Sequence, residues 1–189
     1  MKYENRKDEI IQTAALLFKE KGYSAVTMRD IAKAVGVRAA SLYNHIKSKQ
    51  EILSEIIIAL AEQFTCGMNV IQDAEISSVE KLKRIVKLHV DITANNQNGM
   101  ASLNNDWMHL EADLDYYLRL RKDYENDFRT ILNEGIAKGE LINFDSEVML
   151  FSILSTLRLL YGWIPRREEL NPNYLADKLS GVLLEGVIR

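Results

Sequence analysis

The sequence predicts an all-α protein, and three observations lead to that prediction. Nine glycines and two prolines among 189 residues leave few positions for the turns that a strand-rich chain needs. Apolar residues recur three and four positions apart along most of the chain, whereas the alternation typical of a strand is not convincing anywhere. Three Ser/Thr-x-x-Asp/Glu segments, at 27–30, 48–51 and 77–80, have the pattern of capping boxes, which start helices.

The first helix is predicted from its apolar face. Ile10, Ala14, Leu17 and Phe18 lie on one side of a helix at this spacing. Gly22 follows and can adopt the left-handed backbone conformation that often ends a helix. We therefore expect the helix to end just before this glycine.

A helix-turn-helix layout is predicted next. The Thr27 capping box starts a helix at residue 28, and Gly36 ends it in a tight turn. Residues 39–46 then have room for about two turns of helix, in which Leu42 and Ile46 face the core. In such a layout the second helix enters the major groove of DNA while its neighbour crosses the backbone. The same periodicity fits a generic helical hairpin, so the pattern alone leaves both interpretations open.

Six further helices complete the prediction. They are expected over about 49–72, 77–96, 102–111, 113–137, 146–162 and 172–188. The polar run 95–99 is interpreted as a loop, and a turn is expected at 138–139. Asn171 and Pro172 provide a cap and a first-turn proline for the last helix.

Charge is uneven along the chain. The net charge is −3 at pH 7, but residues 1–53 hold ten Lys and Arg against six Asp and Glu, a net +4. The remaining residues therefore carry a net −7. A basic head on an acidic body is expected when only one end of a protein meets a polyanion. A solvated surface whose charges segregate by chance is the other interpretation.

No feature of the sequence indicates export or a membrane. The first nine residues are mostly charged or polar and are not followed by the apolar core of a signal peptide. The apolar stretches 56–61 and 148–157 are shorter than the roughly 20 residues that cross a bilayer. Cys66 is the only cysteine, so neither an intramolecular disulfide nor a cysteine-based zinc site is possible. We expect a cytoplasmic protein.

Residues 22–53 contain a specific set of residues: Gly22-Tyr23, Thr27, Arg29-Asp30-Ile31-Ala32, Gly36-Val37, Leu42-Tyr43, His45, Ser48-Lys49 and Glu51-Ile52-Leu53. With these residues, the segment resembles the DNA-binding domain of the TetR (tetracycline repressor) family of bacterial regulators. The resemblance implies a ligand-responsive transcriptional regulator, most often a repressor, with about nine helices. It implies a DNA-binding domain over residues 1–48 with three helices, and a larger helical domain for effector binding and dimerisation over 49–189.

The resemblance also implies which residues contact DNA. Thr27 and Lys49 correspond to phosphate contacts at helix N-termini. The recognition helix and its approach correspond to Arg38, Ala39, Ala40, Ser41, Tyr43, Asn44 and His45. Three positions depart from the family pattern: Arg38 replaces the usual Ser cap, at a cost of about 1 kcal/mol, Ala40 replaces a frequent Gly, and Ile46 replaces the usual Phe. Whether Arg38 contacts a phosphate, a guanine or only solvent stays open.

A two-fold regulator reads a two-fold site, so the family implies a homodimer on a palindromic double-stranded DNA operator. The last two predicted helices carry more apolar surface than one side of a monomer needs. The expected interface residues are Phe151, Leu154, Leu157, Tyr161, Leu175, Leu179, Val182 and Leu183. These residues also fit an ordinary core, and that interpretation stays open.

A weaker similarity concerns the effector. The segments 104–110, 121–124, 135–139, 161–163 and 170–172 look like the branch of the family that controls fatty-acid or sterol breakdown and senses acyl-CoA thioesters. An acyl chain needs an apolar tunnel between helices. The candidate lining residues are Trp107, Met108, Leu110, Tyr117, Phe128, Phe151 and Trp163. Aromatic residues at helical spacing are more often plain core.

The sequence does not support an enzyme, a metal site or a cofactor. Asp106 and His109 lie one turn apart, but a di-iron bundle needs two Glu-x-x-His pairs, and neither His45 nor His89 follows an acid at that spacing. A phosphate-binding glycine loop and a nucleophile elbow are both absent from the sequence. A bundle enzyme or a protein-binding adaptor without DNA binding is the alternative function. Salt-sensitive DNA binding would separate a regulator from either.

Overall fold

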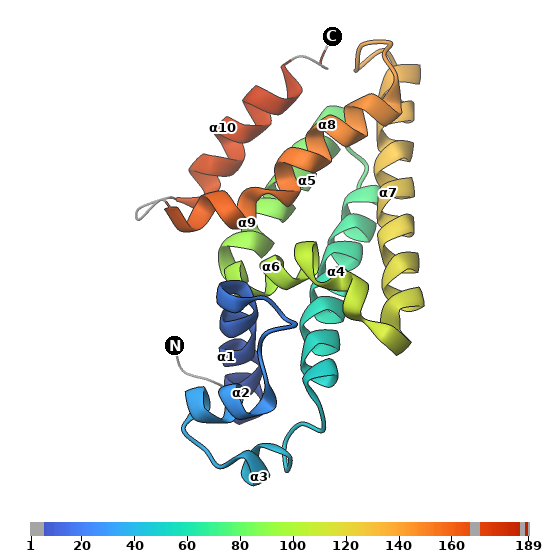
Figure 1. Ribbon diagram of the computed structural model, residues 1–189. Coiled ribbons are helices and arrows are strands. Elements are labelled where there is room, and N and C mark those ends of the chain that lie inside the picture. Colours follow the sequence, from blue (N-terminus) through green and yellow to red (C-terminus); the bar gives the residue numbers. More distant parts are fainter. Residues whose placement is uncertain (1–5, 167–170, 186–187, 189) are drawn as a thin grey trace. The chain divides into compact units, whose positions relative to one another are not determined.

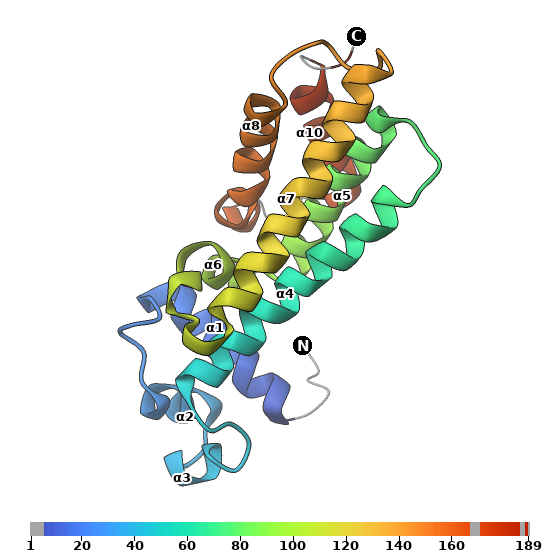
Figure 2. The same ribbon diagram turned by 90° about the vertical axis from the view of Figure 1, so that its right-hand side faces the viewer.

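The computed structural model describes residues 6–166, 171–185 and 188, which form helices and short connections (Figures 1 and 2). The α-helices are α1 (Arg6–Lys21), α2 (Met28–Val35), α3 (Ala39–Leu42), α4 (Lys49–Gln72), α5 (Ser78–Asn95), α6 (Gln97–Asn105), α7 (Leu114–Ala137), α8 (Ser146–Arg158), α9 (Leu160–Trp163) and α10 (Pro172–Leu184). Single 3-10 turns lie at Trp107–His109, Glu111–Asp113 and Ile164–Arg166. In these residues the only β feature is an isolated bridge between Leu141 and Ile188. The prediction of an all-α fold is confirmed.

The chain divides into two compact units. The first contains the described residues up to Ala61 together with Asn96–Tyr117. The second contains Glu62–Asn95 and the described residues from Leu118 onward. Helices α4 and α7 each begin in the first unit and end in the second. Across the described part of the chain, no helix has both the length and the apolar content that a membrane crossing requires.

Several predicted helix ends are confirmed, and local chemistry explains them. Gly22 and Gly139 adopt left-handed conformations, with φ of 82° and 72°, directly after α1 and shortly after α7. The Asn171 side chain accepts hydrogen bonds from the backbone amides of Asn173 and Tyr174, and Pro172 occupies the first turn of α10.

The predicted loop at 95–99 is wrong. Only Asn96 separates α5 from α6, and its carbonyl accepts a hydrogen bond from the Met100 amide at 2.9 Å. Gly99 is buried against α4, because a Cβ atom at this position would lie 3.1 Å from the Leu60 side chain and 3.2 Å from that of Ile56. Close packing therefore forms a helix where the polar composition favoured a loop.

Three other predicted helices differ in their bounds. The helix expected at 102–111 is α6, which ends at Asn105 and is followed by two 3-10 turns. The helix expected at 146–162 is interrupted at Leu159, where α8 gives way to the single turn of α9. The helix expected at 172–188 ends at Leu184, and residues 186 and 187 lie outside the described part of the chain.

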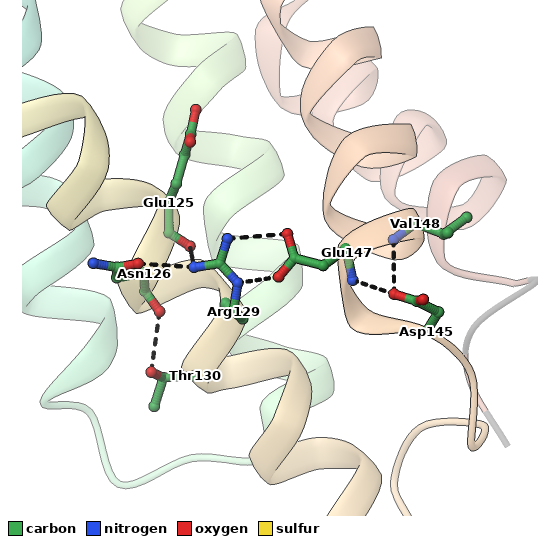
Figure 3. A network of polar contacts seen from close by, with 7 residues as sticks. All are labelled: Glu125, Asn126, Arg129, Thr130, Asp145, Glu147 and Val148. Carbon is green, nitrogen blue, oxygen red and sulfur yellow. Dashed lines mark hydrogen bonds and ion pairs between the residues drawn. The ribbon is translucent and has the colours of Figure 1, made fainter. Parts of the chain in front are cut away.

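Polar contacts fix the start of α8 against α7 in the second unit (Figure 3). The Arg129 guanidinium forms two hydrogen bonds to the Glu147 carboxylate, of which the Nη2–Oε2 distance is 3.0 Å, and a third to Asn126 Oδ1 at 2.8 Å. Asp145 caps α8 by accepting from the Glu147 and Val148 amides. Because the cap fixes the first turn of α8, Glu147 is held where Arg129 of α7 can reach it.

Candidate DNA-binding site

The predicted helix-turn-helix is present and is built on a buried core. The α1–α2–α3 segment and the start of α4 enclose fully buried side chains. Those exposed by 2% or less include Ile10, Phe18, Ile31, Leu42, Ile46, Ile52 and Leu53. Helix α1 contacts both α2 and α6. Such burial holds the short helices in a fixed geometry that they would not keep alone.

The capping box at the start of α2 is confirmed. Thr27 Oγ1 accepts a hydrogen bond from the Asp30 amide at 3.2 Å, and the Asp30 carboxylate accepts from the Thr27 amide at 2.9 Å. The hydrogen bonds from Thr27 lower the pKa of Asp30. Thr27 is exposed beside this helix N-terminus, where remaining backbone amides favour an anion.

Gly36 makes the turn between α2 and α3. Its φ is 77°, a conformation that side chains with a Cβ atom rarely adopt. No described atom outside its neighbours lies within 4 Å of where a Cβ atom would stand, so the demand for glycine comes from the backbone alone. The Val37 amide donates to the Ala32 carbonyl at 2.9 Å and closes the turn.

The recognition helix is shorter than predicted. It covers only Ala39–Leu42, and the chain continues in turns in which the His45 amide donates to the Leu42 carbonyl at 3.0 Å. Within the described residues the Arg38 side chain forms no cap hydrogen bond, as expected from the missing serine. Without that cap, a helix of two turns has little to start it.

The two faces of this recognition segment, residues 38–46, differ as predicted. Leu42 and Ile46 are exposed by 0% and 1%, which confirms that they face the core. Ala39 is half-buried, and the remaining predicted contact residues, Arg38, Ala40, Ser41, Tyr43, Asn44 and His45, are exposed. The segment therefore presents small and polar side chains to solvent while its apolar side chains hold it in place.

Exposed basic side chains lie on α2, which contacts α3, and directly after the recognition segment, but the Lys49 side chain points elsewhere. Arg29, Lys33 and Lys47 are exposed. The Lys49 ammonium donates to the carbonyls of Tyr23 and Val26, each at 2.8 Å, and lies 4.2 Å from the centre of the Tyr23 ring. Burial lowers the pKa of Lys49. In this structure Lys49 fixes the segment that leads into Thr27.

The first unit contains a second cluster that sequence spacing did not identify. The Tyr23 hydroxyl donates to Gln50 Oε1 at 2.7 Å, and Gln50 Nε2 donates to the His109 carbonyl at 2.5 Å. The His109 ring stacks on Tyr23 with ring centres 5.3 Å apart. Ser54 of α4 donates to Asp113 at 2.5 Å. These contacts attach residues 96–117 to the start of α4, across a sequence separation of 59 residues that periodicity cannot bridge.

The candidate effector residues are divided between the two units. In the first unit, Trp107 and Tyr117 have ring centres 5.9 Å apart, Leu110 and Tyr117 are buried, and Met108 is 51% exposed. In the second unit, Phe128 is fully buried, whereas Phe151 is 72% exposed and Trp163 is also exposed.

The candidate dimer residues fall into three groups. Leu154, Leu157 and Leu175 are buried within the chain itself. Tyr161, Leu179 and Leu183 are half-buried. Phe151 and Val182 are 72% and 78% exposed. The last two are accompanied by further exposed apolar residues on α8, its C-terminal end and α10: Val148, Leu159 and Tyr174. Exposed apolar side chains in this number are typical of an interaction surface.

Asp106 and His109 do not extend into a metal site. The described residues contain no group of three His, Cys, Asp or Glu side chains that could hold a metal ion. Burial raises the pKa of the Asp106 carboxyl.

Comparisons with known proteins agree with this geometry. A family model described as "Bacterial regulatory proteins, tetR family" matches residues 10–56, and one described as "Tetracyclin repressor-like, C-terminal domain" matches residues 75–187. The HTH-type transcriptional repressor KstR2 of Mycolicibacterium smegmatis is 27% identical over 187 residues, covering 94% of this chain and 91% of the relative.

Solved structures share the fold. The ketosteroid transcriptional regulator KstR2 of Mycobacterium tuberculosis matches with a TM-score of 0.92 and 21% identity, covering 100% of this chain and 97% of that one. AibR in complex with isovaleryl coenzyme A and operator DNA matches with a TM-score of 0.78 and 22% identity, covering 94% and 97%.

The family match concerns both the extent of the resemblance and the class of protein. It covers both the helix-turn-helix and most of the remaining chain, so the resemblance seen in residues 22–53 extends well beyond them. The matched family consists of regulators, which confirms that the chain is not an enzyme. The chain belongs to the TetR family of bacterial helix-turn-helix transcriptional regulators.

Proposed function

We propose that this protein is a dimeric repressor that binds a palindromic double-stranded DNA operator and releases it when a small apolar or acyl-CoA-like effector binds. The observation that carries the proposal is the recognition segment. Its exposed side chains stand on two fully buried anchors, Leu42 and Ile46, beside exposed Arg29, Lys33 and Lys47. A segment whose exposed side chains are polar and whose buried side chains anchor it to the core can bind in the major groove of DNA. The cations near it can contact the DNA phosphates.

Each DNA-facing residue has a role in this proposal. Ala39, Ala40 and Ser41 are small and let the backbone approach the base edges. Tyr43, Asn44, His45 and Arg38 reach bases or phosphates from exposed positions. Thr27 and Lys49 contact DNA phosphates. Lys49 exchanges the carbonyls of Tyr23 and Val26 for a phosphate when DNA binds.

The dimer is proposed to form through α8 and α10. Phe151 and Val182 are the most exposed apolar side chains on these helices, and covering them in a symmetric contact removes apolar surface from water. The buried Leu154, Leu157 and Leu175 support the helices from within. The half-buried Tyr161, Leu179 and Leu183 lie at the edge of the contact. We assign DNA binding to residues 1–48, and effector binding and dimerisation to 49–189.

Effector control is proposed to act through α4. Helix α4 begins at Lys49 beside the recognition segment and continues into the second unit. Gln50 and Ser54 bind it to the 3-10 turns that precede α7. An effector that binds the second unit and shifts α4 or α7 therefore changes the position of the recognition segment. Release then reflects a higher effector affinity for the form that cannot bind DNA. Of the candidate pocket residues, Phe128, Phe151 and Trp163 belong to the second unit, whereas Trp107, Met108, Leu110 and Tyr117 belong to the first.

We expect Tyr43→Ala to lower operator affinity at least tenfold without changing the oligomeric state. Tyr43 is 52% exposed, so its loss removes DNA contacts and little core packing. A duplex selected from a randomised pool on the immobilised protein serves as the operator, and fluorescence anisotropy measures its affinity. Size-exclusion chromatography with light scattering measures the oligomeric state.

The same duplex tests DNA binding itself. Raising the salt concentration should weaken binding steeply, because each phosphate contact releases counterions. Selected sequences should contain two symmetric half-sites. Failure to enrich any sequence, with no binding at low salt, would show that the chain is not an operator-binding protein.

We expect acyl-CoA thioesters to release the bound duplex at micromolar concentration. AibR, whose fold matches this chain, supports the choice of acyl-CoA, since it was solved with isovaleryl coenzyme A and operator DNA. The measurement is the loss of anisotropy as thioesters of increasing chain length are added to the complex. Free coenzyme A is the control. Retention of DNA across the whole series would remove acyl-CoA as the effector class.

A further inference from the structure

The second unit contains a buried polar cluster formed by α4, α5 and α7. The rings of Phe64, His89 and Tyr124 contact one another, with centres 4.6 Å apart for Phe64 and His89, 6.1 Å for Phe64 and Tyr124, and 5.8 Å for His89 and Tyr124. His89 Nε2 lies 2.8 Å from the Tyr124 hydroxyl. Thr93 follows His89 by one helical turn on α5 and is completely buried. Phe128 follows Tyr124 by one helical turn on α7 and is also fully buried.

Two polar atoms of this cluster have no partner among the described residues. They are His89 Nδ1 and Thr93 Oγ1. His89 and Thr93 are only 4% and 0% exposed, so bulk water does not reach them. Buried polar groups in folded proteins are nearly always hydrogen-bonded, and exceptions call for an explanation. Two exceptions one turn apart on the same helix face indicate a common partner.

The hydrogen-bond partners available to His89 and Tyr124 determine which nitrogen of the His89 ring carries the proton. If Nε2 were protonated, it would donate to the Tyr124 oxygen, and the Tyr124 hydroxyl would then have no acceptor in the described part of the chain. If Tyr124 donates to Nε2 instead, only one group is left unpaired, the Nδ1–H donor. The second arrangement leaves fewer buried groups unpaired, so Nδ1 presents a hydrogen-bond donor.

The buried Thr93 side chain also has a hydrogen-bond donor without a partner among the described residues. A helical threonine commonly donates its hydroxyl to the carbonyl four residues earlier. Thr130 does so to Asn126 at 3.0 Å, and Thr156 does so to Ser152 at 3.3 Å. Thr93 does not use the corresponding carbonyl of His89, although it is completely buried. Its hydroxyl is therefore a second donor available to another group.

The charges near His89 and Thr93 limit which ligand group can accept hydrogen bonds from their two side chains. Burial and the nearby Arg158 lower the pKa of His89 to about 3, so the ring is neutral at physiological pH. The Arg158 guanidinium is already engaged by the Glu125 carboxylate at 2.6 Å. A carboxylate or phosphate entering the cluster would have no free counter-charge among these residues. A neutral acceptor that takes two donors, such as a carbonyl oxygen, fits.

We infer that His89 and Thr93 form the recognition site for the carbonyl group at the head of an effector's apolar acyl chain, with Tyr124 orienting the His89 ring. The inference rests on the proposed function, because it presumes that an effector binds the second unit. The carbonyl oxygen accepts one hydrogen bond from His89 Nδ1 and one from Thr93 Oγ1. The apolar acyl chain of the effector separates α4, α5 and α7 as it enters.

The test compares two ligands that differ only in this carbonyl. Acyl-CoA thioesters carry it, whereas S-alkyl-CoA thioethers of equal chain length do not. Isothermal titration calorimetry on the full chain should give at least tenfold tighter binding of the thioester. Thr93→Val keeps the shape and removes the hydroxyl, and His89→Phe removes the ring donor. Each variant should reduce the preference for the thioester to threefold or less.

Matched variants make the result specific. Thr93→Ser restores a hydroxyl and should restore the preference, and Thr130→Val makes the same substitution at an exposed site and should leave it unchanged. If Thr93→Val and His89→Phe retain the full preference, a buried water satisfies these atoms instead, and the inference is wrong. It is also wrong if no thioester binds, or if thioesters and thioethers bind equally to the unsubstituted chain.

The operator duplex separates this inference from the proposed function. Thr93 and His89 lie outside the recognition segment, so both variants should bind the duplex with unchanged affinity. Loss of carbonyl preference with DNA binding intact supports the inference. Normal operator binding and effector release without any dependence on these residues would leave the proposed function standing and overturn the inference alone.

Discussion

Replacing Leu42 by alanine should lower the free energy of unfolding by about 3 kcal/mol, as removal of a fully buried leucine side chain does in other cores. Leu42 is 0% exposed and is the last residue of the four-residue helix α3. So short a helix has no stability of its own, and it depends on this anchor and on Ile46. The recognition segment should therefore lose its fixed position, and operator binding should fall below detection.

Tyr43→Ala is the matched control for Leu42→Ala. The two residues are adjacent, but Tyr43 is 52% exposed. Its removal should change the free energy of unfolding by less than about 1 kcal/mol, as is usual for surface substitutions, while weakening DNA binding. Urea unfolding followed by far-ultraviolet circular dichroism, at one fixed protein concentration, measures the stability of both variants. Similar losses of stability in the two variants would contradict the inward and outward assignment of these side chains.

Local signals in the sequence predicted the helix-turn-helix well. The Thr27 capping box, the left-handed Gly36 and the inward pair Leu42 and Ile46 all depend on residues within a few positions of one another. Even so, the second capping box differs in detail. Ser48 accepts from the Glu51 amide as predicted, but the Glu51 carboxylate accepts from the amide of Lys47, one residue before the expected one.

Contacts between distant segments could not be predicted in this way. The helix at 97–105 forms because Gly99 packs on α4, which its polar neighbours do not indicate. The Lys49 ammonium donates hydrogen bonds to two backbone carbonyls, and their position depends on the path of the loop before α2. The link between Gln50 and His109 requires two segments that periodicity treats separately. Each of these features is tertiary, and single-sequence patterns carry information mainly about local structure.

Apolar periodicity also did not separate core from surface in the last helices. Phe151 and Leu154 belong to the same helix, three residues apart, yet the first is 72% exposed and the second 2% exposed. A pattern of apolar residues on two sides of a helix is compatible with both a core and an interface. His89 is a further residue whose burial the sequence did not indicate, and its hydrogen-bond partner is Tyr124.

The buried His89 makes stability depend on pH in a direction that can be predicted. Its pKa is about 3 in the folded chain and 6.5 in the unfolded chain, because burial opposes the charged form. Between these values the unfolded state binds a proton that the folded state does not. Stability is therefore unaffected by His89 above pH 6.5 and falls as the pH drops below it. The expected loss is about 1.4 kcal/mol per pH unit, or on the order of 2 kcal/mol at pH 5.

The free energy of unfolding, measured from pH 7.5 to pH 5, should therefore be flat at first and then decline with a slope of about one proton. His89→Phe should remove that decline whatever its effect on the overall stability, because the comparison concerns the slope. The range above pH 5 avoids most carboxyl titration, which makes the difference between the two slopes attributable to His89. Parallel curves for the two proteins would mean that His89 takes up no proton on unfolding. That result would contradict its burial against Phe64 and Tyr124 and, with it, the neutral donor on which recognition of a carbonyl depends.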